Sequence, residues 1–460
     1  MHLLQRIPVT FSGGDEASDL YLRRHEQVTS FDTYFGAFAA SYWREITGVT
    51  AVALSAVVRG SGTAELIALT DGNETVLHQV ANASGDIEFP VVPIAGGTHD
   101  ALFLRITGCE LVEASWSTTD APVRGVRLMG VITTFNRHEY VRHTVGQFGA
   151  LADDVPAVMS GFRLCVVDNA RNFALGESSA LGVTLVPNPN LGGAGGFARG
   201  LMEARNGGWA THVLFMDDDI AIEPESLVRT IALLQFATDP MCCVHGAMIS
   251  EEQPWLCVEA GADYIWQSVY PPRPLHHLED LRDRDVALAK KLERPYAYSA
   301  WWYTAFPLAL TRDNPLPVFI RGDDVAWGLM HTRGHIQTLP GIGVWHADFD
   351  IKNVPAAVYY EIRNITIASL LTEPSYRWWH LEKRFLGYAF LNLFAMRYLS
   401  TEYLLRGIND FFAGPEKLMA TDHAALHSDL YSRDEEKSSQ LDDRLAGVAM
   451  DPCLLYTSPS

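Results

Sequence analysis

Cysteines, basic residues and long apolar runs are all scarce in this chain of 460 residues. The six cysteines lack metal-ligand spacing and several lie inside apolar stretches, so we expect buried thiols in a reducing compartment. Lysine and arginine number 35 against 55 acidic residues, and the formal charge of -20 argues against nucleic acid or an electrostatically held anionic membrane as the main partner. No apolar stretch reaches the roughly 18 residues that span a bilayer, and no signal peptide opens the chain. We therefore expect a cytoplasmic protein, with attachment to the inner face of the plasma membrane left open.

The sequence is instead rich in apolar residues, at 48%, which is ample for two or three domains with cores. Between about residues 41 and 117, short β-branched runs alternate with turn signals that begin at Gly60, Asp71, Ala83 and Gly96. The expected strands are Val49–Val58, Ala64–Leu69, Thr75–Val80, Ile87–Val92 and Ala101–Ile106. This spacing predicts a small antiparallel sandwich or barrel. It carries no catalytic constellation, which favours a packing module over a carbohydrate-binding one.

After this block the pattern changes to strand, helix and strand. The expected buried strands are Val126–Thr134, Phe162–Val167, Val183–Pro187 and His212–Met216. Their alternation with helical segments predicts right-handed βαβ units and a doubly wound sheet.

Beyond about Tyr359 the chain reads as helical and aromatic. The aromatic residues recur at helical spacing, with Lys383, Arg384 and Arg397 among them: Trp378, Trp379, Phe385, Tyr388, Phe390, Phe394 and Tyr398. This pattern favours a helix packed in a core over an interfacial membrane anchor. The last eight residues, Cys453 to Ser460, resemble a translated sequencing adaptor, so we expect a non-native tail there.

An apolar run stops abruptly at three consecutive carboxylates, Asp217, Asp218 and Asp219. Such a run is typical of a buried strand, and the end of a strand is where α/β sheets place ligands. Three neighbouring carboxylates repel one another and suit Mg²⁺ or Mn²⁺. The alternative is an acidic turn that caps the helix expected from Glu223 to Gln235.

Polar side chains also follow the other strands. Arg137 after the first strand suits a phosphate, and Asp168 after the second suits a base or ribose. A helix cap is the alternative at each turn, and it is the favoured explanation of Thr134 or Asn136 taken alone. The glycine-rich segment from Asn188 to Gly200 lets backbone approach a ligand closely and opens a helix whose N-H groups suit an anion. It is neither a Walker loop nor a GxGxxG fingerprint, and a loop without function remains the alternative.

Three later motifs carry further chemistry. Trp301 and Trp302 are adjacent aromatics of the kind that hold sugar rings, although burial explains one of them equally well and at most one would face a ligand from a regular strand. Asp323 and Asp324 follow a second apolar run, where a carboxylate suits a general base. His346 is structural by default, but with the acidic triplet it would complete an Asp/His metal site.

Taken in order, these motifs resemble family 2 inverting glycosyltransferases of the GT-A fold, and more narrowly the polymerising bacterial galactofuranosyltransferases of galactan synthesis. The resemblance covers about Val126 to Asn364. It implies an α/β, Rossmann-like, mostly parallel catalytic domain over residues 123–370. An N-terminal β-sandwich or barrel would occupy residues 1–122, a helical region residues 371–452 and the non-native tail residues 453–460. The region from Glu259 to Asp263 departs from the family's acceptor-side pattern. The resemblance therefore specifies the class of reaction better than it specifies the donor and the acceptor.

The resemblance also implies a role for each motif. Asp217, Asp219 and His346 would hold Mn²⁺ or Mg²⁺, and Asp324 would be the catalytic base with Asp323 beside it. The nucleotide diphosphate would be bound by Thr134, Phe135, Arg137, Asp168, Asn190, Gly193, Asp217 and Asp218. Trp301 and Trp302 would cradle the acceptor.

The resemblance predicts a metal-dependent transferase that moves galactofuranose from UDP-galactofuranose onto a glycan or lipid-linked glycan by single displacement. A family 2 transferase for another donor, such as dTDP-rhamnose, is the alternative. A sugar nucleotidyltransferase would need a basic, glycine-rich motif at the first strand, which the chain lacks, and intact acidic motifs count against a noncatalytic glycan-binding protein. Peripheral membrane association and a homo-oligomer are left open.

Overall fold

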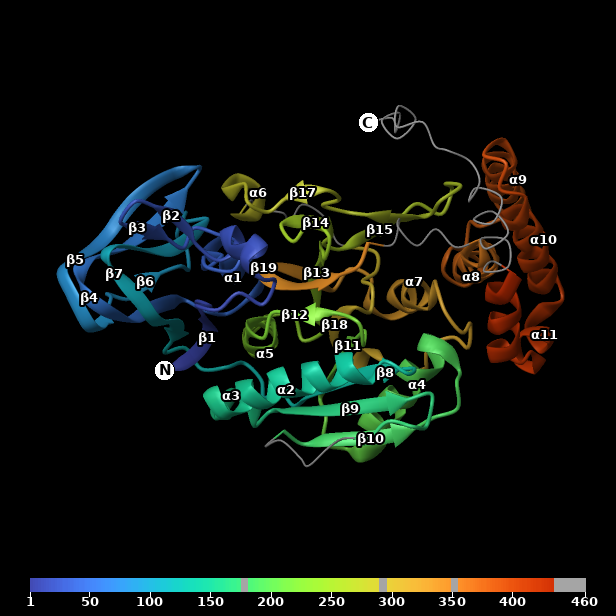
Figure 1. The fold of residues 1–460 in the computed structure, drawn as a ribbon, viewed down its shortest axis with the longest axis horizontal. Coiled ribbons are helices and arrows are strands. Elements are labelled where there is room, and N and C mark those ends of the chain that lie inside the picture. The colour runs from blue at the N-terminus through green and yellow to red at the C-terminus, as the bar shows by residue number, and fades with distance from the viewer. Residues whose placement is uncertain (175–180, 289–295, 349–354, 434–460) are drawn as a thin grey trace, which may run out of the picture.

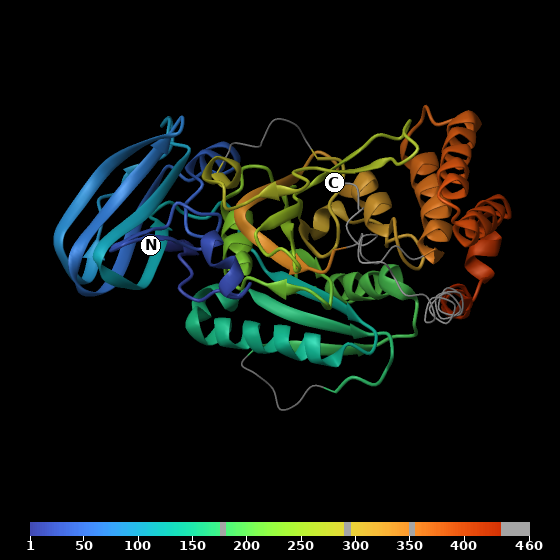
Figure 2. The same cartoon turned by 45° about the horizontal axis from the view of Figure 1, so that its top comes forward.

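The computed structural model describes residues 1–174, 181–288, 296–348 and 355–433. An antiparallel β region, an α/β region and a group of helices follow one another along the molecule (Figure 1), and a second view shows the same order (Figure 2). The predicted α/β fold between an N-terminal β region and C-terminal helices is therefore confirmed. The boundaries given for these parts stay a prediction, and the suspected tail from Cys453 lies outside the described residues.

The N-terminal region is built on a seven-stranded sheet in the order β2-β3-β7-β4-β5, with β1 on β7 and β6 on β4. Every pairing in it is antiparallel. Its elements are β1 (His2–Arg6), a 3-10 turn η1 (Asp15–Leu20), β2 (Arg23–His25), β3 (Val28–Ser30), α1 (Ala40–Ile46), β4 (Ala51–Thr70), β5 (Asn73–Glu88), β6 (Val92–Pro93) and β7 (Ala101–Thr118).

Two of the turns expected in this region lie inside strands. The segments at Gly60 and Ala83 belong to β4 and β5, where the pairing shifts register near Gly62 instead of reversing the chain. Glycines with positive φ absorb the irregularity, as Gly60 and Gly85 do at 92° and 67°. The prediction of separate strands was wrong here because a bulge and a turn carry the same glycine signal. The turn at Asp71 is confirmed.

The α/β region has a ten-stranded sheet in the order β10-β9-β8-β11-β18-β13-β14-β17, with β19 beside β13 and β12 beside β19. The first four strands are parallel, as the βαβ pattern predicts, and the sheet is mixed from β18 onward. The strands of the parallel part are β8 (Leu128–Thr134), β9 (Phe162–Asp168), β10 (Val183–Pro187) and β11 (His212–Met216). The strands beyond them are β12 (Ala221–Ile222), β13 (Cys243–Ser250), β14 (Leu256–Glu259), β17 (Glu279–Asp280), β18 (Tyr303–Pro307) and β19 (Ile336–His346), and a separate pair is formed by β15 (Ala262–Tyr264) and β16 (Pro272–Pro274).

Helices cover both faces of this sheet. They are α2 (His138–Asp154), α3 (Pro156–Met159), α4 (Gly192–Gly207), α5 (Glu225–Phe236), α6 (Arg284–Leu288) and α7 (Asp323–Trp327), with a 3-10 turn η2 (Leu308–Leu310) and a π-helical turn η3 (Gly328–Thr332). Alternate residues of β8 point to opposite faces. Ile132 packs in one core with Val141 of α2, whereas Val131 packs in another with Phe197 of α4. The first core also extends into the N-terminal sheet, so the two regions share apolar packing.

The C-terminal helices α8 (Ala356–Thr372), α9 (Trp378–Phe394), α10 (Tyr398–Phe412) and α11 (Gly414–Ala420) form the end of the molecule opposite the β region (Figure 1). The expectation that the aromatic residues of α9 pack in a core holds for Tyr388, which is buried. It was wrong for Trp378, Phe390 and Phe394, which are 70%, 66% and 80% exposed. Within the described residues, no helix has both the length and the apolar character needed to cross a membrane.

Candidate metal and nucleotide site

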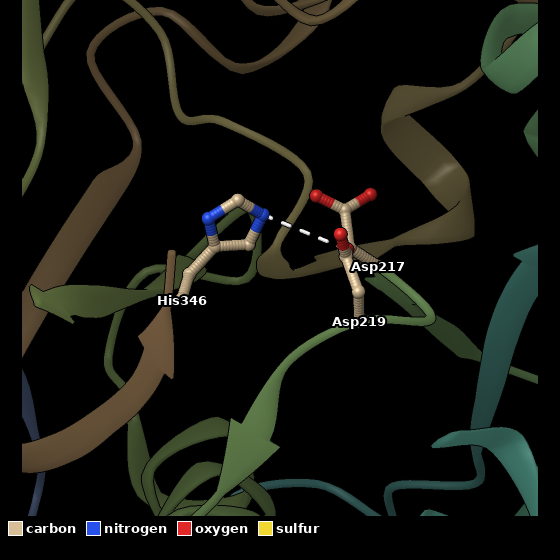
Figure 3. A group of neighbouring side chains, drawn as sticks. All are labelled: Asp217, Asp219 and His346. Atoms are coloured by element: carbon tan, nitrogen blue, oxygen red, sulfur yellow. Dashed lines mark ion pairs between the residues drawn. The ribbon is translucent and has the colours of Figure 1, made fainter. Parts of the chain in front are cut away.

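Two strand ends bring the predicted metal ligands together. Asp217 and Asp219 follow β11, and His346 is the last residue of β19. The short strand β12, which begins two residues after Asp219, pairs with β19 directly before His346, so local pairing joins the two ends. The ligand atoms of the three side chains all lie within 4.8 Å of one another, and Nε2 of His346 is 3.5 Å from Oδ1 of Asp219 (Figure 3).

The electrostatics of this cluster suit a cation. Burial raises the pKa of Asp217 to about 7, and the neighbouring Asp219 carboxylate contributes to that rise. Burial alone would lower the pKa of His346, but its pairing with Asp219 and the charge of Asp217 raise it overall. Two carboxylates and one imidazole are ligands that Mn²⁺ and Mg²⁺ accept, so the donor set fits such an ion.

The alternative explanation of the triplet as a helix cap does not match the structure. Helix α5 begins at Glu225, its N-cap is Pro224, and no side chain caps it. The remaining carboxylate, Asp218, is buried and accepts a hydrogen bond of 3.0 Å from Nη1 of Arg137. The same nitrogen pairs with Asp219 at 2.5 Å, so Arg137 lies against the acidic triplet.

The predicted nucleotide-binding residues lie at the carboxyl edge of the parallel strands. Thr134 at the end of β8 is in register with Asp168 at the end of β9. Both are buried, whereas Phe135 is half exposed. The Asp168 oxygens accept hydrogen bonds from the backbone N-H groups of Ala170 and Phe173, at 2.9 and 2.7 Å. In this structure Asp168 therefore shapes the loop at the edge, which sequence reasoning did not anticipate.

Glycines of the glycine-rich segment pack closely against other parts of the chain. A Cβ on Gly192 would lie 2.2 Å from the carbonyl oxygen of Phe319, and one on Gly196 would lie 2.1 Å from the methyl group of Thr133. Asn190 accepts a hydrogen bond of 3.2 Å from the N-H of Gly192. Gly193 differs, because its Cβ would meet only Asp323, at an ordinary contact distance of 3.7 Å. Close packing of α4 thus explains Gly192 and Gly196 without a ligand.

The second acidic pair begins helix α7. Asp323 is buried, and its pKa is well above the usual value because of burial and the charge of Asp324. Asp324 is less covered, and burial raises its pKa to about 6. The charge of Asp324 also raises the pKa of Asp217, so the acidic pair lies within electrostatic range of the metal cluster.

The two tryptophans are both 5% exposed, on different sides of the chain. Trp301 packs against Phe215 and, at 6.5 Å between ring centroids, against Trp327 on α7. Trp302 donates a hydrogen bond of 2.9 Å from Nε1 to the carbonyl of Gly246. The acceptor role predicted for them stays a prediction, since protein already covers most of each ring.

Sequence reasoning gave no role to one acidic residue, which it named only as the start of the segment that departs from the family's acceptor-side pattern. Glu259, at the end of β14, is buried, and its Oε1 has no hydrogen-bond partner among the described residues. Burial and the charge of Asp324 raise its pKa well above the usual value. The sequence did contain a signal for Glu259, because this acid ends a short apolar run that begins at Leu256. Asp217 and Asp323 likewise follow apolar runs.

Comparison with known proteins supports the resemblance. Residues 15–118 match the family model of the galactofuranosyltransferase 2 N-terminal region. The galactofuranosyltransferase GlfT2 of Mycobacterium tuberculosis is 28% identical over 436 residues, which cover 87% of this chain and 68% of that protein. GlfT2 of Mycolicibacterium smegmatis is 29% identical over 438 residues, covering 87% and 66%. The chain thus spans about two thirds of the length of these relatives.

Among solved structures, a mannosyltransferase from Pyrobaculum calidifontis, in complex with GDP-Man and Mn²⁺, aligns with a TM-score of 0.34 and 15% identity. The alignment covers 72% of this chain and 91% of that one. The resemblance to galactofuranosyltransferases predicted from the motifs is confirmed by the two sequence relatives and the family model.

Proposed function

We propose that this chain, a glycosyltransferase with sequence similarity to GlfT2 enzymes, transfers galactofuranose from UDP-galactofuranose to a growing cell-surface glycan. The observation that carries this proposal is the similarity to two galactofuranosyltransferases over 87% of the chain. The cluster of Asp217, Asp219 and His346 supports it, and so does the nearby Asp324, whose charge acts on Asp217.

In this proposal Asp217, Asp219 and His346 hold Mn²⁺ or Mg²⁺. Their donor atoms, all within 4.8 Å of one another, support that role. The ion, when bound, would neutralise the charge that develops on the departing UDP. Arg137, which lies against the same triplet, would add a cation at the diphosphate. The nucleotide would lie along the edge formed by Thr134, Phe135, Asp168, Asn190, Gly193 and Asp218.

Asp324 acts as the general base. Its carboxylate takes the proton from an acceptor hydroxyl while that oxygen bonds to the anomeric carbon of the sugar. The bond from this carbon to the diphosphate oxygen breaks on the opposite side, and UDP leaves with the electron pair. One displacement inverts the anomeric centre and forms no covalent bond to the enzyme. The pKa of about 6 keeps Asp324 mostly ionised at neutral pH and still basic enough to accept the proton.

Trp301 and Trp302 would bind the acceptor, with Trp301 on the side of Asp324. The packing of Trp301 against Trp327, one helical turn beyond Asp324, supports this placement. Glu259, whose pKa is raised by the charge of Asp324, would contribute a further carboxyl near the base. We assign it no proton transfer.

We also propose peripheral association with an anionic membrane through an apolar stripe on α9, defined as Trp379, Leu386, Phe390 and Phe394. All of these side chains are exposed, at helical spacing on one face. The segment from Arg377 to Arg397 carries four basic residues and one acidic residue, opposite to the balance of the whole chain. Exposed aromatic and apolar side chains with adjacent cations are typical of interfacial helices.

Nucleotide release tests the reaction and the donor. The protein is incubated with Mn²⁺, a galactan-like acceptor and either UDP-galactofuranose, UDP-galactopyranose or dTDP-rhamnose. We expect acceptor-dependent UDP release from UDP-galactofuranose that stops in Asp324→Asn. Strong release from another donor would replace the sugar assignment, and pyrophosphate formed from UTP and a sugar phosphate would indicate a nucleotidyltransferase. Release from no donor, with glycan binding intact, would indicate a binding protein.

A further inference from the structure

The loop that leads into the catalytic acids has a strained backbone. Phe319 and Arg321 have φ angles of 78° and 59°, in the left-handed region that side chains other than glycine rarely adopt. Gly322, which follows them, has a φ of 76°. Such strain persists only where surrounding contacts fix the conformation, and it gathers at functional sites. The loop is followed at once by Asp323 and Asp324.

One side chain of α8 binds the carbonyl groups of this loop. Nδ2 of Asn364 donates hydrogen bonds to the carbonyls of Ile320 and Arg321, at 2.8 and 2.7 Å, and lies 3.4 Å from that of Val318. Asn364 is 1% exposed, so water does not compete for these carbonyls. Two of its contacts are to the residues that immediately precede Gly322, where the backbone turns into α7.

The neighbouring Arg363 fixes Asn364. Its Nε donates to Oδ1 of Asn364 at 2.8 Å, and its Nη2 donates to the carbonyl of Val318 at 2.9 Å. Nη1 donates to the hydroxyl of Tyr359 at 2.7 Å, and the guanidinium lies over the Tyr359 ring. Arg363 is 2% exposed. Its guanidinium also lies over the Tyr360 ring, and the Tyr359 hydroxyl that it binds donates in turn to Oδ2 of Asp410 at 2.8 Å. Burial of a guanidinium costs free energy that its hydrogen bonds and ring contacts must offset, so these contacts hold Arg363 in one position.

The opposite side of the loop is held by α4. The carbonyl of Phe319 accepts a hydrogen bond of 3.1 Å from the N-H of Ala194, and Gly192 lies directly against it. The loop therefore lies between the glycine-rich start of α4 and the Arg363 and Asn364 pair of α8. This loop leads directly into α7, so its position sets the position of the first turn of that helix. Within this turn, Oδ1 of Asp324 accepts a hydrogen bond of 2.8 Å from the N-H of Val325.

We propose that Asn364, supported by Arg363, is a positioning residue that holds the strained loop and thereby places the carboxylate of Asp324 at the acceptor hydroxyl. Neither side chain touches substrate in this proposal. The inference rests on the proposed function, because it requires Asp324 to be the base. A misplacement of about 1 Å in a reacting group costs roughly 100-fold in rate, so the loss of these hydrogen bonds should appear in kcat.

The test compares Asn364→Ala with Ser369→Ala in the complete chain. Ser369 is a fully buried residue on the same helix, and its hydroxyl lies 2.5 Å from that of Tyr264, away from the loop. We expect Asn364→Ala to lower kcat by about 100-fold and to leave the Kd of UDP with Mn²⁺, measured by calorimetry, within about threefold. Ser369→Ala should lower the melting temperature while kcat stays within about threefold.

Unchanged kcat in folded Asn364→Ala would overturn the inference, as would parallel losses of kcat and UDP affinity. If Asn364→Ala does not fold, Arg363→Lys carries the same test, because it keeps the buried charge and removes the donors to Asn364 and Val318. Asp324→Asn, assayed in parallel, separates the two proposals. Turnover retained in Asp324→Asn would show that Asp324 is not the base, and the positioning role would be contradicted with it. An inactive Asp324→Asn with an active Asn364→Ala would remove only the positioning role.

Discussion

Gly192 and Phe319 are so close that a Cβ on the glycine would lie 2.2 Å from the phenylalanine carbonyl oxygen. The contact joins the start of α4, at the nucleotide edge, to the loop before Asp324. Gly192 also has a φ of 70°, where any side chain is strained. A side chain at this position must therefore move the loop, the helix or both.

We predict that Gly192→Ala lowers kcat by about 100-fold, because the displaced loop carries the base away from the acceptor. Steady-state kinetics with UDP-galactofuranose measures the effect, and circular dichroism checks that the variant is folded. Gly207→Ala, at the other end of α4, is the matched control, because a Cβ at that position would have no described atom within 4 Å and its φ is not in the left-handed region. Equal rates for the two variants would show that this contact does not position the base.

The pH dependence of turnover should report the environment of Asp324. Burial raises its pKa to about 6, and the charge of Arg321 opposes that rise. A base works only when it is deprotonated, so kcat/KM should fall about tenfold per pH unit below pH 6 and level off above it. In Arg321→Gln the opposing charge is lost, the pKa rises further, and the acid limb should move to higher pH.

Arg333→Gln is the control for that shift. Arg321 forms a 2.9 Å salt bridge with Glu361, and Arg333 forms one of the same length with Glu373. Arg333 is not among the groups that shift the pKa of Asp324. Profiles of kcat/KM against pH for wild type and both variants provide the measurement. An acid limb that stays in place in Arg321→Gln would contradict the assignment of this limb to Asp324.

Metal dependence should reside in the two carboxylates and the histidine. We predict that Mn²⁺ tightens UDP binding to wild type and that Asp219→Asn reduces this gain by about tenfold or more, since an amide oxygen is a weaker ligand for a divalent cation. Calorimetry with Mn²⁺ and with EDTA measures the gain directly. Asp239→Asn provides the control, because Asp239 is also paired with a histidine, His335, at 2.8 Å. An unchanged Mn²⁺ effect in Asp219→Asn would remove this residue from the ligand set.

Local sequence patterns were sufficient to predict those parts of the site that depend on a single strand. The run from His212 to Met216 is fully buried and ends just before the acids, because a strand covered on both faces is apolar until it leaves the sheet. The role of His346 depended on the acidic triplet and on the resemblance together, since a single histidine after an apolar run is not specific. The pairing of β12 with β19 explains why it lies beside Asp219.

Tertiary contacts decided what the sequence did not reveal. Arg363 and Asn364 read as ordinary polar residues of a helix, and their importance depends on carbonyl groups more than 40 residues away. The glycine-rich segment correctly predicted a close approach of the backbone, but it did not reveal what approaches. A bound ligand and a packed protein segment both exclude a Cβ at such a position. The aromatic residues of α9 showed helical spacing, and spacing alone does not say which face is covered.

The apolar stripe on α9 gives the last prediction. If Trp379, Phe390 and Phe394 insert into a lipid interface, each contributes roughly 1.5–3 kcal/mol of apolar burial, so changing all three to serine should weaken vesicle binding by well over tenfold. Co-sedimentation with phosphatidylcholine vesicles, with and without phosphatidylglycerol, measures the affinity, and the basic residues predict stronger binding to the anionic vesicles. Serine at three other exposed valines, Val76, Val91 and Val123, is the control and should bind as wild type does. If the wild-type chain self-associates in light scattering and binds neither kind of vesicle, the stripe is an interface between two copies of this chain instead.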